Sequence, residues 1–352
     1  GRLFADRWSP SPHKVSLPAM AIEADGLTTA LLWRPTDAPE PPVATFASPN
    51  FLDGQQNHLA QLAVPGSGAL RRENDSVAHR PLVIEAGTTL TGPAYLLHAE
   101  PDLPVARVAQ RWYELFGPPA APPPVHDDAE TYELIARNYG ETVYWPEENG
   151  WTHHWFFPEK PRYVERHASE LIVHALHTGR TQWIERTRLA GRMIIDAAGK
   201  LAARLADDSG ARQALREMQP DGTWTFVNTP EMRKATRWWT KNEYETLGED
   251  GSSSLGTCVQ PALQILHRAQ LTGDPEMLRA SIRALEAMRR FRVPRGAQVW
   301  EVHQQIPDIR AAALAVEAYQ IGYRLTEDRR YLEDANYWAW TGVPFIYSWR
   351  VP

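Results

Sequence analysis

The chain has 352 residues, of which 43% are hydrophobic and 23% are charged, a balance that is typical of globular proteins and excludes a disordered, collagen-like or coiled-coil chain. The net charge is −6, so electrostatics gives no reason to expect nucleic acid or an anionic membrane as a partner, and no apolar run is long enough to span a bilayer. The single cysteine, Cys258, excludes internal disulfides and any zinc site built from cysteines.

Residues 1–117 predict a β-sandwich that ends in a linker helix. Short apolar runs alternate with clusters of Gly, Pro, Asn and Asp, which is typical of sandwich strands and their turns. The runs are 19–26, 27–33, 43–47, 81–86 and 94–99. Residues 101–116 then carry apolar side chains at helical spacing, which predicts the linker helix.

Proline and alanine fill most of the next segment, and the pattern changes after it. Residues 118–125 include five prolines, which cannot continue a helix or join a sheet interior. We therefore predict a linker over 118–125 and a helical domain over 126–352.

The helical domain contains an internal repeat. Thr178, Thr272 and Thr326 each follow an apolar helical pattern, and each is followed five and six residues later by an aromatic residue or Met and then by an aliphatic residue. The intervals of 94 and 54 residues fit a period of about 50. A repeat of this length predicts stacked αα-hairpins, which can form an open solenoid or close into a ring.

The segment Thr272-Gly273-Asp274-Pro275-Glu276-Met277-Leu278 resembles the Thr-Gly-Asp turn of six-hairpin glycosidases, the (α/α)6 toroids. The order of β-sandwich, linker helix and helical repeat is also similar to that of these enzymes. The resemblance implies a multidomain α and β protein with an N-terminal sandwich and an α/α-hairpin toroid. Six hairpins would need about 300 residues, whereas 126–352 has room for four to five, so we expect an incomplete toroid and a fragment.

In these toroids the substrate cleft lies at the N-terminal ends of the inner helices. The resemblance maps this cleft onto 144–155, onto 237–245 with 251–256, and onto 299–308. These stretches combine tryptophans with carboxylates, amides and imidazoles, a mixture suited to the flat faces and hydroxyl groups of sugars. The expected substrate-binding residues are Asn149, Trp151, His153, His154, Trp155, Trp238, Trp239, Tyr244, Glu245, Trp300, His303 and Gln304.

Hydrolysis of a glycosidic bond requires a general acid and a base or nucleophile, both of them usually carboxyl groups. Glu301, beside Trp300, is the candidate acid, because desolvation by the indole would raise its pKa. Asp308 is the candidate base, and its place resembles that of the catalytic Asp in unsaturated-uronide hydrolases, although Asp is also a favoured helix N-cap. Glu243 is the alternative partner of Glu301.

The sequence therefore predicts a glycoside hydrolase that acts on an oligosaccharide or polysaccharide and needs no metal or cofactor. One alternative is a polysaccharide lyase in which Tyr244 or His303 abstracts a proton next to a uronate carboxylate. Another is a helical repeat that binds glycans or proteins without catalysis. Adjacent histidines rarely bind one ion, so His153 and His154 do not change the expectation about metals.

Overall fold

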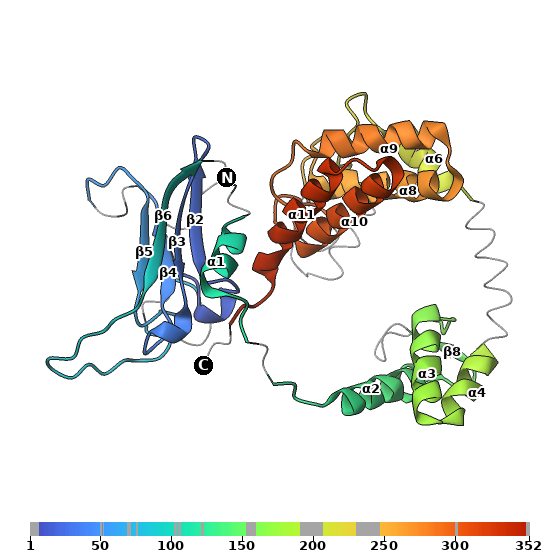
Figure 1. Ribbon diagram of the computed structural model, residues 1–352, viewed down its shortest axis with the longest axis horizontal. Coiled ribbons are helices and arrows are strands. Elements are labelled where there is room, and N and C mark those ends of the chain that lie inside the picture. The colour runs from blue at the N-terminus through green and yellow to red at the C-terminus, as the bar shows by residue number, and fades with distance from the viewer. Residues whose placement is uncertain are drawn as a thin grey trace. The chain divides into compact units, whose positions relative to one another are not determined.

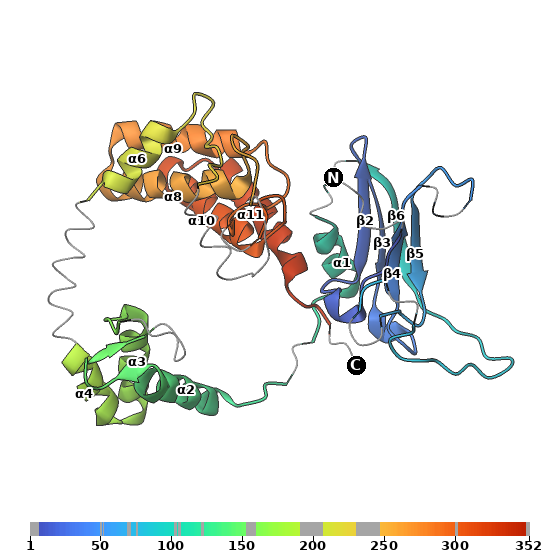
Figure 2. The same ribbon diagram turned by 180° about the vertical axis from the view of Figure 1, so that it is seen from behind.

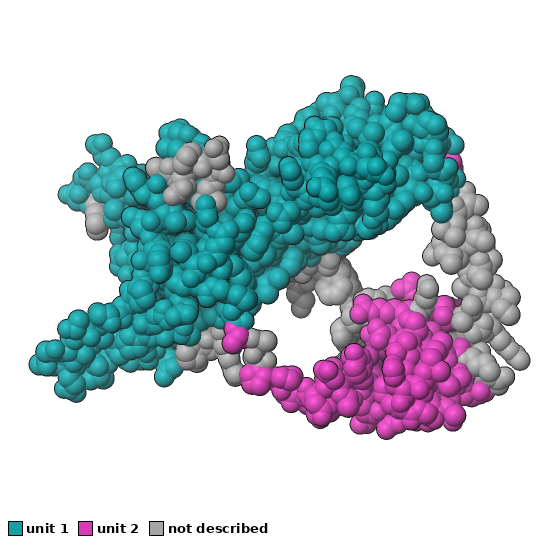
Figure 3. Space-filling model, in the orientation of Figure 1, with its two compact units in different colours: residues 1–119, 211–352 teal, residues 120–210 magenta. Residues whose placement is uncertain are grey.

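The computed structural model describes residues 7–49, 51, 53–68, 72–74, 77–101, 104, 107–120, 123–152, 160–190, 207–229, 247–299 and 302–349. The chain forms two compact units, one of residues Gly1–Pro119 with Ala211–Pro352 and the other of residues Ala120–Gly210 (Figure 3). The described part is a mixture of nine α-helices and small antiparallel sheets. None of the described helices is long and apolar enough to cross a membrane.

The first unit begins with two three-stranded antiparallel sheets (Figure 1). One has the order β1-β4-β5 and the other the order β2-β3-β6. Residues Asp25 and Gly26 have φ values of 50° and 74°, so a tight turn joins β2 to β3 as the sequence predicts. The strands are β1 (Arg7–Trp8), β2 (Ala19–Ala24), β3 (Leu27–Trp33), β4 (Val43–Ala47), β5 (Leu59–Ala63) and β6 (Ala94–Pro101).

The period of two along β3 places its side chains in two different cores. Ala30 and Leu32 join a cluster with Trp112 of helix α1 (Val108–Phe116). Leu31 and Trp33 join a cluster with residues of β4 and β5 instead. The indole of Trp112 donates a hydrogen bond of 2.8 Å to the carbonyl of Trp33, which fixes α1 on the sheet.

Two sequence predictions in this region are wrong. The run 81–86 forms no strand, and Val83 and Ile84 are 83% and 53% exposed, so these apolar side chains have no sheet to pack on. The helix predicted from residue 101 begins at Val108, because β6 continues to Pro101.

The described helices in the C-terminal part of the first unit are α6 and two antiparallel hairpins, α8–α9 and α10–α11, and α8 packs along α10 (Figures 1 and 2). Buried side chains from α6 and from these four helices form the largest core cluster of the described residues. The helices are α6 (Ser209–Glu217), α8 (Leu255–Thr272), α9 (Pro275–Met288), α10 (Ile309–Thr326) and α11 (Arg330–Gly342).

The second unit is small and packs around tryptophans. Trp151 and Trp183 are fully buried, and a Cβ on Gly140 would lie 1.9 Å from the Trp183 ring, so glycine is required there. The unit contains α2 (Asp128–Arg137), a π-helical turn (Asn138–Thr142), β7 (Tyr144–Trp145), β8 (Gly150–Trp151), α3 (Glu165–Thr178) and α4 (Thr181–Ala190). Short 3₁₀ helices elsewhere are Pro12–Lys14, Pro35–Asp37 and Val343–Phe345.

The three hairpin turns predicted from the repeat are confirmed. In each, the threonine hydroxyl donates a 2.8 Å hydrogen bond to the carbonyl four residues earlier. The next residue is left-handed, with φ values of 71°, 66° and 60° in chain order, and its N–H also bonds four residues back. The residue five positions after each threonine is buried, and these residues are Trp183, Met277 and Tyr331.

Candidate functional site

The N-terminal ends of α8 and α10 are joined by the loops that precede them. Ser254 caps α8 and forms a capping box with Thr257. Asp308 caps α10. The N–H of Gly256, in the first turn of α8, donates a 2.7 Å hydrogen bond to the carbonyl of Arg295, in the loop before α10. The start of α8 is therefore hydrogen-bonded to the loop that leads into α10.

Asp308 is 4% exposed, and both of its carboxylate oxygens accept backbone hydrogen bonds. Its Oδ1 accepts from the N–H of Ala311 at 2.7 Å, which caps the helix. Its Oδ2 accepts from the N–H of Ala297 at 3.1 Å, which fixes the preceding loop. This carboxylate therefore holds Ala297 of the preceding loop against the start of α10.

Gln304 connects that loop to the start of α8. Its side chain is fully buried, Oε1 accepts from the Ser252 hydroxyl at 2.6 Å, and Nε2 donates to the Ser254 hydroxyl at 3.4 Å. Its backbone N–H also donates to the carbonyl of Leu247 at 2.6 Å. We call Ser252, Ser254, Gln304 and Asp308 the cap network.

Glycine permits the close approach of the backbones at the cap network. A Cβ on Gly256 would lie 2.1 Å from the Ala297 nitrogen, and one on Gly296 would lie 2.1 Å from the Ser254 hydroxyl. Gly296 also has a φ of 82°, a conformation that other residues adopt only with strain. Both positions therefore exclude larger side chains.

The residues beside the network are apolar and fully packed. Trp224 and Phe226 are 4% and 3% exposed, and the Trp224 carbonyl accepts from the Ser253 hydroxyl at 2.6 Å. Cys258 is buried under Trp224, and this burial raises the pKa of its thiol, so it is not suited to act as a nucleophile.

The structure brings the described parts of two of the three predicted cleft stretches together. Ser252 and Ser254, from 251–256, bond to Gln304, from 299–308. His303 lies beside Gln304 and is half-buried. Its Nδ1 accepts from the N–H of Gln305 at 3.2 Å, and Nε2 has no hydrogen-bond partner among the described residues. His303 therefore presents a nitrogen that a ligand could use.

The third stretch, 144–155, belongs to the second unit, and its described candidates have structural contacts. Asn149 occupies the turn between β7 and β8 with a φ of 51°, and its Oδ1 accepts from the Tyr144 hydroxyl at 3.3 Å. Trp151 is fully buried, and its indole donates to the carbonyl of Tyr139 at 2.7 Å. The Trp151 ring therefore packs in the core and offers no face to a sugar.

Many of the predicted site residues lie outside the described residues. They are Glu243, Glu301, His153, His154, Trp155, Trp238, Trp239, Tyr244, Glu245 and Trp300.

Sequence reasoning missed the part played by the serines and glycines. Ser254 precedes Thr257 by three residues at the start of an apolar helical run, a spacing that could have identified the cap. The bonds of Ser252 to Gln304 and of Asp308 to Ala297 have no sequence signal, because nothing in the spacing indicates which loops meet.

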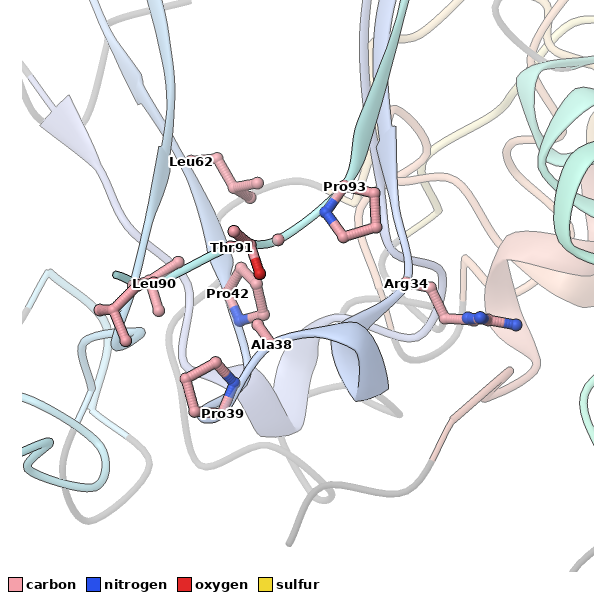
Figure 4. A pocket seen from close by; sticks show the side chains of 10 residues that line it. Arg34, Ala38, Pro39, Pro42, Leu62, Leu90, Thr91 and Pro93 are labelled. Atoms are coloured by element: carbon pink, nitrogen blue, oxygen red, sulfur yellow. The ribbon is translucent and has the colours of Figure 1, made fainter. Parts of the chain in front are cut away.

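A small cavity in the β part has a different character. It has a volume of about 100 Å³ and is lined mainly by prolines and aliphatic side chains of 34–42, 62–64 and 90–93 (Figure 4). Arg34 points away from the other lining side chains and pairs with Asp37 at 2.7 Å. The described residues that line this cavity include no carboxylate and no imidazole, so they offer no groups for acid–base chemistry.

Within the described ranges, no three His, Cys, Asp or Glu side chains come together in a way that could hold a metal ion. No family model matches the chain, and no curated protein matches it significantly.

Proposed function

We propose that the protein is a glycoside hydrolase that cleaves an oligosaccharide or polysaccharide at the N-terminal ends of α8 and α10. In this proposal the helical hairpins belong to an (α/α)6-type toroid, and the two sheets form its N-terminal β-sandwich. The cap network supports the proposal most strongly. It joins the loop that follows the Trp- and Glu-rich segment 237–245 to the loop that contains Trp300 and Glu301.

The contacts of Asp308 favour Glu301 and Glu243 as the carboxyl pair. Asp308 is 4% exposed, and each of its oxygens is held by a backbone N–H group, so the carboxylate is poorly placed to reach a water or a sugar. We therefore assign Asp308 a positioning role, and the loop that it fixes carries Glu301.

Glu301 would donate a proton to the leaving oxygen, and Glu243 would act as base or nucleophile on the other side of the bond. His303 would contribute a hydrogen bond from Nε2 to a sugar hydroxyl. Trp238, Trp239 and Trp300 would supply aromatic faces for the rings.

The test is a hydrolysis screen against glycans of varied composition with the full chain and its Glu301→Gln, Glu243→Gln and Glu249→Gln variants. Glu249 is an exposed carboxylate at the border of the same loop and serves as the matched control. We expect the first two substitutions to lower kcat by at least ~100-fold, the scale of general acid–base catalysis. Unchanged activity in both would refute the assigned pair.

The capping role of Asp308 also supports a second candidate, a glycan-binding repeat without catalysis, because the one carboxylate of the network is buried and serves as a cap. Glycan binding that survives both substitutions, without cleavage of any glycan by the wild-type chain, would favour this candidate.

A further inference from the structure

A second cavity, of about 490 Å³, lies in the first unit beside α11, away from the cap network. Four of its lining residues, Glu333, Asp334, Tyr337 and Trp338, belong to α11, and Arg289 and Arg292 lie at and after the end of α9. Pro104 and Arg107 complete it from the segment before α1. Its volume is in the range of small-molecule sites.

One of its three arginines is already neutralised. Arg289 donates to Oδ2 of Asp334 through Nε and Nη2 at 2.9 and 2.7 Å, and Nη1 donates to Glu286 at 2.9 Å. Its guanidinium carbon also lies 5.6 Å from the centre of the Tyr331 ring. These contacts hold one wall of the cavity, and the two carboxylates more than offset the charge of Arg289, so this group carries a net charge of −1.

The other two arginines have no ion pair with any described residue. Arg107 is half-buried, and its Nε is buried without a hydrogen-bond acceptor. A buried N–H without an acceptor loses its hydrogen bond to water and gains none in return, so an acceptor supplied by a ligand would be favoured there. Arg292 is exposed at the rim. Among the described residues that line the wall, Glu333 is the one carboxylate outside the Arg289–Asp334 pair, and it is exposed. The charge of Glu23 also acts on Tyr337, together with those of Arg107 and Arg292.

Aromatic side chains also line the cavity. The hydroxyl of Tyr337 donates to the carbonyl of Arg292 at 2.7 Å, which ties the rim to α11. Phe291 and Tyr337 are both half-buried and line the cavity. The wall thus combines unpaired guanidinium groups, ring surfaces and a carboxylate that can accept hydrogen bonds from hydroxyl groups.

We propose that this cavity binds an acidic sugar of monosaccharide size, whose carboxylate or phosphate is held by Arg107 and Arg292. Guanidinium groups bind both anions through paired N–H donors. The sugar ring lies against Phe291 and Tyr337, and Glu333 accepts from its hydroxyl groups. The site is separate from the proposed hydrolytic site, and the proposal holds whether or not the chain cleaves glycans.

The experiment is isothermal titration calorimetry on the full chain with glucuronate, glucose 6-phosphate, glucose and inorganic phosphate. The variants are Arg107→Gln, Arg292→Gln and the control Arg279→Gln, an exposed arginine of α9 that does not line the cavity. We expect saturable binding of at least one acidic sugar, at least tenfold weaker in each cavity variant and unchanged in Arg279→Gln. Binding of glucuronate alone identifies a carboxylate ligand, and binding of glucose 6-phosphate alone identifies a phosphate ligand.

A second measurement uses the wild-type chain alone, so it does not depend on whether a variant folds. Arginine-specific modification by phenylglyoxal, mapped by peptide mass spectrometry, should be slowed at Arg107 and Arg292 by the bound sugar and left unchanged at Arg279. The proposal is overturned if no acidic sugar binds, if glucose binds as tightly as the acidic sugars, or if the ligand protects neither cavity arginine.

Discussion

Replacement of Asp308 by alanine should loosen both the start of α10 and the loop before it. The wild-type carboxylate is buried and bonds to two backbone N–H groups, those of Ala297 and Ala311. Alanine leaves both donors without an acceptor. The substitution should therefore destabilise the backbone at residue 297, eleven positions earlier in the chain, as well as the start of the helix.

The size of the effect follows from the two bonds. A hydrogen bond to a charged group contributes about 1.5–3 kcal/mol, and a lost N-cap alone costs about 1 kcal/mol. Because each of the two N–H groups loses its acceptor oxygen, we expect Asp308→Ala to lower the local free energy of opening by about 3 kcal/mol. This corresponds to roughly a 150-fold increase in the equilibrium constant for local opening of this region. Asp308→Asn can keep only one bond, because the amide nitrogen cannot accept, and should cost about 2 kcal/mol.

Hydrogen exchange followed by mass spectrometry measures this directly, because local opening energies set amide protection. Peptides covering 294–299 and 308–314 should lose protection together. Asp274→Ala is the matched control, because Asp274 caps α9 through Oδ1 alone and should cost only about 1 kcal/mol. A loss of protection confined to 308–314, or one no larger than that in the control, would refute the proposed role of Asp308.

Four further outcomes follow from the structure. Glu327→Gly should raise the free energy of unfolding, measured by urea denaturation, by about 0.5–1 kcal/mol, because residue 327 has a φ of 60° and the other two hairpin turns have glycine at this position. A lower free energy of unfolding would contradict this interpretation of the turn. Gly256→Ala should prevent the α8 start from closing on the loop, since its Cβ would lie 2.1 Å from backbone atoms, and should lower the melting temperature by several degrees. Hydrogen bonds to Thr223 and Arg290 lower the pKa of Asp221 to about 2, so its contribution to stability is present above the ordinary carboxyl pKa and is lost as the pH falls towards 2. Asp221→Asn should therefore flatten the acid limb of a stability–pH profile. An unchanged acid limb would contradict this role of Asp221. Cys258 should react with a thiol reagent only on unfolding, and rapid labelling of the native chain would show that its burial is transient.

The local features of the fold were the ones that the sequence could predict. The spacing after Thr178, Thr272 and Thr326 predicts hairpin turns because the left-handed residue and the buried residue five positions after each threonine are set by neighbouring residues. The turn at residues 25 and 26 is local in the same way.

Sequence patterns could not predict which elements and side chains far apart in the chain contact one another. The hairpin α3–α4 lies in the second unit and the other two hairpins lie in the first, although all three share one turn pattern. Gln304 could be predicted as a ligand-binding amide in a loop, but its burial depends on serines about 50 residues away in the chain. Trp151 has polar neighbours in sequence, yet its ring is surrounded by side chains of its own unit.

Cleavage of a susceptible glycan in water enriched in oxygen-18 tests the central claim most directly, with the wild-type chain and Glu301→Gln compared side by side. A glycoside hydrolase should place one labelled oxygen in the product for each bond cleaved, and the variant should lose this activity. An unsaturated product without the label would show a lyase, and absence of cleavage across the glycan panel would contradict the proposed function.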